Sequence, residues 1–171
     1  MAIHDTTPVE QRTLSVLVEN RAGVLSHVVG LFSARCFNIA SLAVGETEDP
    51  TMSRITLVAE GDQKTIEQIK KQLNKLIDVI KIQDLTDEEF IDRELMLVKV
   101  KNDSLTRSAL EPLLSKYRLR IVDENSKVLA IECVESRENT KSIFEAFKQI
   151  GIIELAQTGA VALSKKPPKS E

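Results

Sequence analysis

The sequence predicts an α+β protein built from two ferredoxin-like βαββαβ units in tandem. Two observations support this prediction. Apolar residues recur with strand and helix periods in the order β-α-β-β-α-β, and the same order starts again after an acidic stretch. The chain of 171 residues suits two small domains of about 80 residues each. Neither half has the long helices of a doubly wound α/β fold, so we expect a four-stranded antiparallel sheet with two helices on one face in each unit.

The elements of the first unit follow from its changes of period. Leu14, Val16 and Val18 alternate, which predicts a strand, and from Val24 the apolar residues recur with a helical period. Asp62 breaks a later strand and can cap the helix behind it. The predicted elements are a strand over residues 12–20, a helix over 24–36, strands over 38–46 and 52–60, a helix between 62 and 76, and a strand over 77–85.

The second unit repeats this order after the acidic residues 86–89. Gly151 is expected to end its last helix. Pro112 should kink the preceding helix unless that helix begins late. The predicted elements are a strand over residues 95–100, a helix over 105–117, strands over 119–123 and 128–134, a helix around 143–150 and a strand over 152–155. The predicted domains are residues 12–85 and 92–165, with a linker at 86–91 and flexible termini at 1–11 and 166–171.

Each predicted unit leaves one face of its sheet without helices. In the first strand, Leu17 makes the opposite face partly apolar as well. Strands of this kind bury the second face, or a sheet edge, against another chain. We therefore expect a dimer.

Composition excludes several classes of function. Lys plus Arg total 23 against 26 Asp plus Glu, without the basic excess of a nucleic-acid-binding protein. No apolar run approaches the roughly 20 residues of a membrane span. Cys36 and Cys133 lie far apart, which predicts a reducing, cytoplasmic location. No group of residues has metal-ligand spacing or pairs a nucleophile with a base, so we expect no enzyme activity.

The turn between the first strand and helix has the groups that a small zwitterion needs. Asn20 supplies an oxygen for an ammonium group and an NH₂ for a carboxylate. Gly23 permits an unusual backbone conformation, and the N–H groups of the helix behind it attract a carboxylate. Val24 and Leu25 can contact an apolar side chain. The same residues suit a plain glycine turn with Asn20 in a local bond, and chemistry alone favours that interpretation.

A set of motifs extends this pattern along the chain. The stretch from Leu14 to Leu42 contains Glu19-Asn-Arg-Ala-Gly-Val-Leu and Phe37-Asn-Ile, and further matching stretches lie at residues 49–56, 67–79, 93–100 and 158–164. Together they resemble the small, regulatory subunit of acetolactate synthase (acetohydroxyacid synthase), whose first half is an ACT domain. The resemblance covers residues 12 to about 165 and is densest over 14–82.

The resemblance implies a regulatory subunit without catalytic activity. It implies that the chain binds a branched-chain amino acid, usually valine, activates a separate catalytic subunit and confers feedback inhibition on it. No cofactor is expected in this chain, whereas the catalytic partner is expected to carry thiamine diphosphate, Mg and FAD.

The family's effector lies between two ACT domains of a homodimer, which gives two equivalent sites. The resemblance therefore implies a site made by two chains. One chain contributes Asn20, Arg21, Ala22, Gly23, Val24 and Leu25, with Ser26 next to the site, and the other contributes Asn38 and Ile39.

Two departures from the family pattern stand out. The family usually has Gly where this chain has Cys36, and keeping a left-handed conformation with Cys costs on the order of 1 kcal/mol. In the second half, Tyr117-Arg-Leu-Arg lacks the Gly that often follows an Arg in the family.

Two other functions fit parts of the sequence. A free-standing amino-acid-sensing ACT module would act on another enzyme or on gene expression, and the second case needs a DNA-reading helix pair or a basic face, which the sequence lacks. An acylphosphatase-like enzyme would use Arg21 and Asn38, but the turn at Asn20–Gly23 is too short and poor in glycine for a full phosphate cradle.

Overall fold

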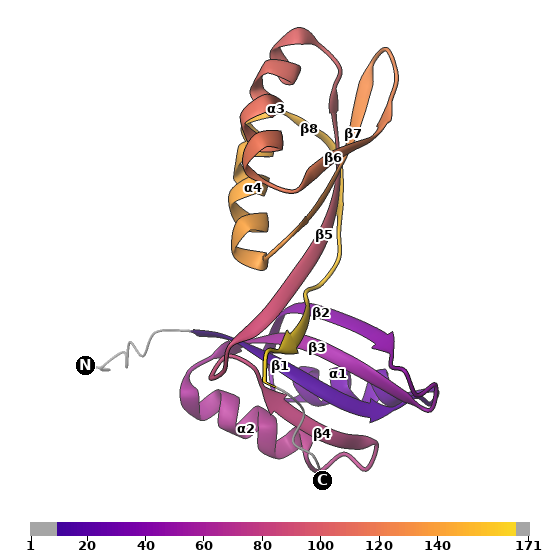
Figure 1. Cartoon of the computed structure of the whole chain (residues 1–171). Coiled ribbons are helices and arrows are strands. Elements are labelled where there is room, and N and C mark those ends of the chain that lie inside the picture. Colours follow the sequence, from indigo (N-terminus) through magenta and orange to yellow (C-terminus); the bar gives the residue numbers. More distant parts are fainter. Residues whose placement is uncertain (1–9, 167–171) are drawn as a thin grey trace, which may run out of the picture. The chain divides into compact units, whose positions relative to one another are not determined.

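The computed structural model describes residues 10–166. The predicted flexible termini lie mostly outside that range, at residues 1–9 and 167–171. Of the described residues, 10–90 and 162–166 form one compact unit and 91–161 form a second (Figure 1). No helix among the described residues is both long enough and apolar enough to cross a membrane.

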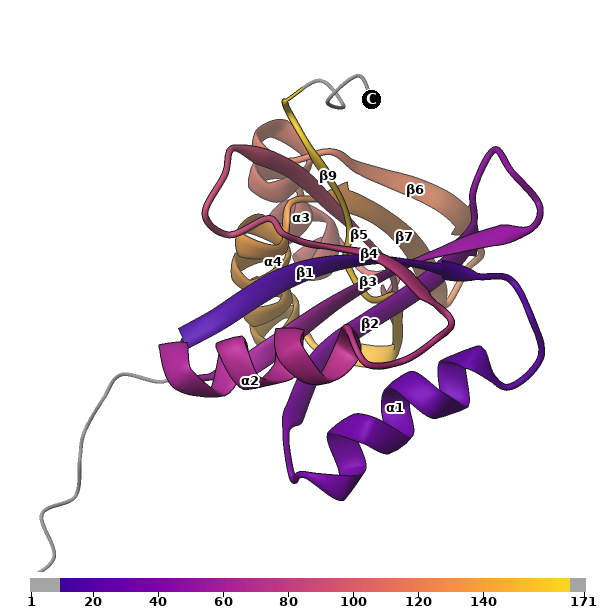
Figure 2. The same cartoon turned by 90° about the horizontal axis from the view of Figure 1, so that it is seen from below.

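The first unit has the predicted order of elements. Its strands form an antiparallel sheet in the order β2-β3-β1-β4, and both helices lie on one face of that sheet (Figure 2). β1 begins two residues earlier than predicted and β4 two residues later. The elements are β1 (Glu10–Glu19), α1 (Val24–Ala34), β2 (Asn38–Glu46), β3 (Met52–Gly61), α2 (Gln63–Leu73) and β4 (Val79–Asp84).

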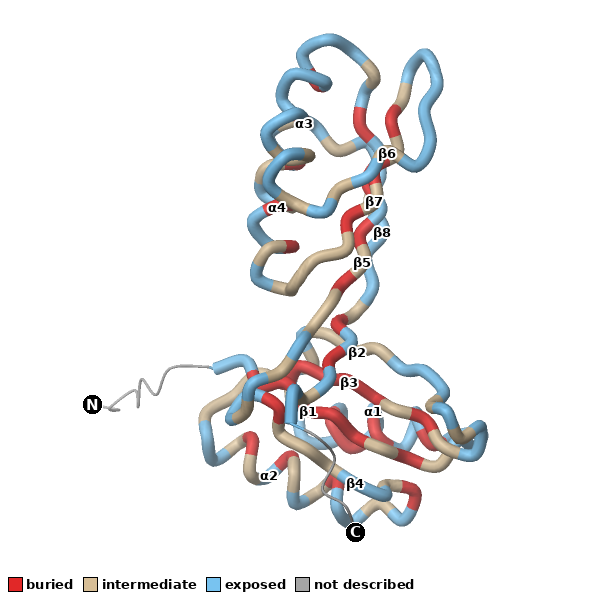
Figure 3. The backbone as a smooth tube through the Cα atoms, viewed as in Figure 1, coloured by how far each residue is buried: buried red, intermediate tan, exposed pale blue. Residues whose placement is uncertain are grey.

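The core of this unit lies between the sheet and the two helices. Alternate residues of β1 and β3 face the helices in register, so that Leu14 pairs with Leu57 and Val16 with Ile55. All four are fully buried, and Figure 3 shows the buried residues concentrated on these two strands. Burial of each such side chain stabilises the fold by about 1.5–3 kcal/mol. The helices add Val24, Val28, Leu31, Phe32, Ile66, Ile69 and Leu73.

The second face of the sheet has no helices, as predicted, but part of it is covered within the chain. Ser15, Thr56 and Val58 point away from the helices, yet each is less than 4 % exposed. Part of the cover is local, because Gln83 on this face donates to the Glu88 carboxylate at 3.4 Å, and Ser164 donates to the same carboxylate at 2.9 Å. The chain after β4 and Ser164 both contact this face, and no pattern in the sequence indicated these contacts.

The second unit repeats the same plan, with its own core. Its sheet has the order β6-β7-β5-β8, and the buried residues Met96, Val98, Ile131, Ile143 and Phe147 pack together. The elements are β5 (Phe90–Lys101), α3 (Ser104–Lys116), β6 (Leu119–Glu124), β7 (Val128–Glu135), α4 (Arg137–Ile150) and β8 (Ile152–Gln157).

The ends of the helices in this unit test two predictions. Gly151 follows α4 with a φ of 104°, so its predicted role in ending the helix is confirmed. α3 does not begin late, because Asp103 caps it from the side chain and Pro112 lies inside it. Pro112 has no N–H to donate, so the helix continues without one of its backbone bonds.

One strand was not predicted. β9 (Val161–Ser164) pairs with β5, and the Lys165 N–H donates to the Glu89 carbonyl at 2.9 Å. Four residues are too few for a period to be recognised, and the contact joins distant parts of the sequence, since Lys165 and Glu89 are 76 positions apart.

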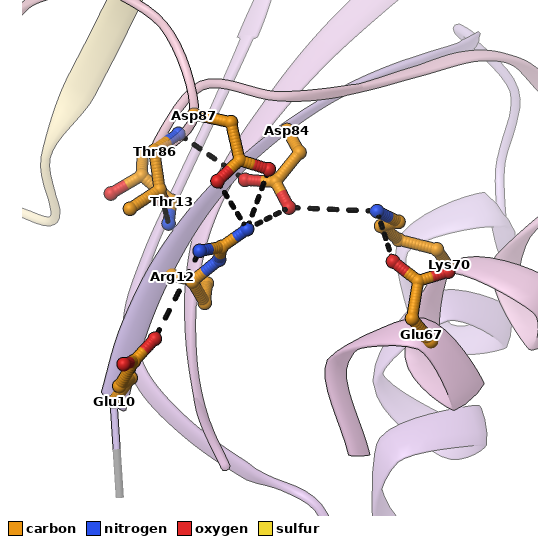
Figure 4. Close-up of polar contacts among 8 residues, drawn as sticks. All are labelled: Glu10, Arg12, Thr13, Glu67, Lys70, Asp84, Thr86 and Asp87. Atoms are coloured by element: carbon orange, nitrogen blue, oxygen red, sulfur yellow. Dashed lines mark hydrogen bonds and ion pairs between the residues drawn. The ribbon is translucent and has the colours of Figure 1, made fainter. Parts of the chain in front are cut away.

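Arg12 is the centre of a polar cluster where β1 meets the end of β4 (Figure 4). Its Nη2 donates to Asp84 at 3.1 Å and to Asp87 at 2.6 Å. The Lys70 ammonium lies 3.6 Å from the same Asp84 carboxylate. Arg12 and Asp84 are both almost fully buried, whereas the Asp87 side chain is 60 % exposed. The cluster therefore ties β1, α2 and the start of the predicted linker to one buried ion pair.

Replacing Arg12 should destabilise the fold strongly. Arg12→Met removes the main partner of a buried carboxylate, and we expect a loss of about 3 kcal/mol in the free energy of unfolding. Asp87→Asn serves as the matched control, since an exposed partner contributes less than about 1 kcal/mol. Urea unfolding measures both. Equal stability of the two variants would contradict this account of the cluster.

The C-terminus of α1 ends in a Schellman motif with Cys36 in the glycine position. Cys36 has a φ of 55°, the one left-handed non-glycine residue among residues 10–166. The Phe37 N–H donates to the Phe32 carbonyl at 3.0 Å, and the Cys36 N–H donates to the Ser33 carbonyl at 3.2 Å. Both bonds, and the edge-to-face contact of the Phe32 and Phe37 rings at 6.1 Å, are those of the motif. The conformation that favours glycine is therefore kept despite the Cys.

Cys36→Gly should stabilise the protein. Cys36 is exposed, so the substitution loses no packing while it relieves the left-handed strain. We expect a gain of about 1 kcal/mol, measured by urea unfolding. Cys36→Ala is the control, because it removes the thiol and keeps the Cβ. A Gly variant no more stable than the Ala variant would show that Cys36 is not strained.

Candidate functional site

The turn Asn20–Gly23 connects β1 to α1 and leaves the start of the helix uncovered. Gly23 precedes the helix with a φ of 90°, a conformation that side chains rarely adopt. A Cβ there would meet no atom within 4 Å. Backbone conformation, not crowding, therefore explains the glycine, and the space in front of the turn is open.

The N-terminus of α1 differs from those of the other described helices. Asp62, Asp103 and Ser136 each accept from a backbone N–H in the first turn of α2, α3 and α4. α1 has no side-chain cap. The N–H groups of Leu25 and Ser26 have no acceptor among the described residues, so they are available to an external carboxylate.

Asn20 fastens the turn to the β2–β3 hairpin. Its backbone N–H donates to the Thr51 carbonyl at 2.7 Å, and its Nδ2 donates to the Pro50 carbonyl at 2.9 Å and to Glu46 at 3.1 Å. Both amide hydrogens are thus used within the chain. Its Oδ1, which has no partner among the described residues, remains as an acceptor for an ammonium group.

Asn102 occupies the same place in the second unit. It follows β5 as Asn20 follows β1, its N–H donates to the Lys127 carbonyl at 2.9 Å, and its Nδ2 donates to the Asn125 carbonyl at 2.6 Å. The two helix N-termini differ, because Asp103, the residue after Asn102, caps α3. Its carboxylate accepts from the Thr106 N–H at 2.8 Å. The second unit therefore has the same tether but a helix N-terminus closed by a carboxylate.

The other predicted residues of the turn have separate surroundings. The Arg21 guanidinium pairs with Glu19 and lies 2.9 Å from Asp78. Val24 is buried in the core, so its side chain is not presented to a ligand. Leu25 is 41 % exposed, and Ala22 and Ser26 are also on the surface.

Asn38 and Ile39 begin β2, beyond the opposite end of α1. Asn38 donates to the Glu60 carboxylate, and Ile39 packs against the core. A β-bulge follows Ile39 in the pairing with β3. The 11 residues of α1 span about 16 Å at 1.5 Å per residue. One chain therefore does not bring the turn together with Asn38, and a site that uses both requires two chains.

Asp78 also belongs to this region, although no pattern in the sequence indicated it. Its buried carboxylate contacts Arg21 and His27, and the His27 hydrogen bond, opposed by burial and helped by Arg21, lowers the pKa of Asp78. The His27 side chain is 62 % exposed, whereas that of Asp78 is 9 % exposed. Asp78 lies more than 50 positions from both partners, so no local pattern reveals the contact.

Two models of known protein families match this chain, one in each half. Residues 14–81 match the family described as "AHAS small subunit-like ACT domain", and residues 93–166 match "Small subunit of acetolactate synthase".

Individual relatives and a solved structure match over nearly the whole chain. The chain is 44% identical over 155 residues to the acetolactate synthase small subunit of Mycolicibacterium smegmatis, which covers 91% of both chains. It is 42% identical to that of Haemophilus influenzae, over 91% of this chain and 96% of the relative. The crystal structure of the small subunit from Thermotoga maritima superposes with a TM-score of 0.82 at 35% identity, covering 92% of this chain and 99% of that one.

Proposed function

Since the chain belongs to the family of acetolactate synthase small subunits, a regulatory role follows, and we propose that it senses valine at the start of α1. Valine would confer feedback inhibition on the catalytic subunit, and the chain would also raise that subunit's activity. The carboxylate of valine binds the N–H groups of Leu25 and Ser26.

The observation that supports this proposal is the open N-terminus of α1. Of the four helices within residues 10–166, three use a side chain to satisfy their first turn, and α1 has a left-handed glycine there instead. An uncapped N-terminus carries a partial positive charge that favours a carboxylate. Asn20 Oδ1, beside this turn, supplies an acceptor for the ammonium group, and the exposed Leu25 supplies apolar contact.

The second half of the proposed site is Asn38 and Ile39 of another copy of this chain. β2 is an edge strand and has no charged residue from Asn38 to Gly45. Edge strands that stay unpaired usually carry charges. The other edge strands do so, with Lys81 in β4, Arg120 in β6 and Glu154 in β8. Leu25 and Val29 also leave an exposed apolar strip on α1. These features support a homodimer formed through β2 and α1, with two equivalent sites.

The proposed partner is the thiamine-diphosphate-dependent catalytic subunit of acetolactate synthase, with Mg and FAD bound there and no cofactor in this chain. Cys36 and Cys133 are both free thiols. Free thiols suit the cytoplasm, where we place the complex.

Reconstitution with a catalytic subunit tests the function. The chain alone should turn over no pyruvate. Added to the catalytic subunit, it should raise the rate of acetolactate formation and make that rate sensitive to valine. A catalytic subunit of the same organism without this chain is the reference. Rates unchanged by the chain, with and without valine, would contradict the proposed function.

Substitution of Gly23 tests the site. Gly23→Asp places a carboxylate at the α1 N-terminus, where it competes with that of valine, so we expect valine affinity to fall at least about tenfold, or 1.4 kcal/mol. Activation of the catalytic subunit should persist. Gly23→Ala is the control, because it introduces the same left-handed strain without a charge and its Cβ meets no neighbour.

Calorimetry with valine measures both variants. The Ala variant should keep valine affinity within about threefold of the wild type, less than 1 kcal/mol. Equal affinities of the Asp and Ala variants would place the carboxylate of valine elsewhere.

A further inference from the structure

Asp78 connects three parts of the chain around the candidate turn. It lies between α2 and β4, and its backbone carbonyl accepts from the Glu19 N–H at the end of β1 at 2.9 Å. Its side chain is only 9 % exposed, whereas those of Arg21 and His27 are both more than 60 % exposed. A buried acid therefore lies beneath two exposed basic side chains.

The two oxygens of the Asp78 carboxylate serve different partners. Oδ1 accepts from the Arg21 guanidinium at 2.9 Å, and Oδ2 accepts from His27 Nδ1 at 3.0 Å. Arg21 lies two residues before Gly23, and His27 lies four residues after it. The carboxylate consequently holds the chain on both sides of the glycine.

The turn has little else to hold it. Gly23 contributes no side chain, and the Val24 N–H to Arg21 carbonyl bond is long, at 3.3 Å. Asn20 fastens only the first residue of the turn, through its bonds to the β2–β3 hairpin. Among the described residues, Asp78 is the one side chain that contacts the turn on both sides of Gly23.

These contacts also limit how well the Arg21 guanidinium can bind a ligand carboxylate. Its guanidinium pairs with Glu19 as well as with Asp78. A cation shared by two carboxylates is committed to the protein and is a poor partner for a third, free carboxylate. The backbone N–H groups of Leu25 and Ser26 are then the donors that remain for a ligand.

We propose that Asp78 is a positioning residue for the effector site: its carboxylate holds Arg21 and His27 on either side of Gly23, and this keeps the α1 N-terminus open and correctly oriented. The proposal rests on the proposed function, because it assigns Asp78 a role in valine binding. Asp78 itself does not contact the effector. It acts through the backbone of the turn.

Calorimetric titration of the full chain with valine tests this role. Asp78→Asn keeps the size of the side chain but loses the charge and one acceptor, and we expect valine affinity to fall about tenfold. Activation of the catalytic subunit should stay unchanged. Asp103→Asn is the matched control, since it weakens an equivalent carboxylate at the closed α3 N-terminus and should leave valine affinity unaltered.

A second comparison separates positioning from a general loss of stability. If Asp78 acts through Arg21, then Arg21→Ala should weaken valine binding in the wild type and have little further effect in the Asp78→Asn background. Fully additive losses would overturn the proposal, as would an unchanged valine affinity in Asp78→Asn. If the wild type itself binds no valine, the proposed function fails, and this inference fails with it. If the wild type binds valine and Asp78→Asn binds it with the same affinity, this inference fails while the proposed function stands.

Discussion

The pairing of β1 on both of its edges is the constraint on which the first unit depends. β1 is hydrogen-bonded to β3 on one side and to β4 on the other, and its alternate residues form the centre of the core. Polar contacts close both ends of this strand: Arg12 with Asp84 at one, and Glu19 with Asp78 at the other. The candidate site is thus a short turn attached to a strand that is paired on both edges, which suits a site that must hold a small ligand in one orientation.

The two units share a fold but differ at the N-terminus of their first helix. Asn20 and Asn102 make the same pair of bonds to the following hairpin, which is a shared structural role that sequence identity did not reveal. The difference lies in the residues that precede the helix. Gly23 leaves the α1 N-terminus uncapped, whereas the Asp103 carboxylate occupies that of α3. The electrostatics of a single helix turn therefore favour an external carboxylate at the first helix of the first unit and oppose one at that of the second.

Local patterns predicted the fold well, because strand and helix periods depend only on neighbouring residues. The order of elements, the cap at Asp62 and the helix end at Gly151 are confirmed. Contacts between distant residues were not predictable. The pairing of β9, the cover over Ser15 and Thr56, and the contacts of Asp78 all join segments separated by tens of positions. At the site, the sequence indicated the turn and its glycine, but not that Asn20 uses both amide hydrogens internally or that Val24 is buried.

In the proposed site, valine binds the open α1 N-terminus of one chain and Asn38 of another. An NMR titration of the ¹⁵N-labelled chain with valine tests it most directly, because each backbone amide reports its own surroundings. We expect the largest shifts at Gly23, Leu25 and Ser26, a second group at Asn38 and Ile39, and none at Ser104 and Leu105 at the start of α3. Shifts confined to the second unit, or the absence of any shift at saturating valine, would contradict it.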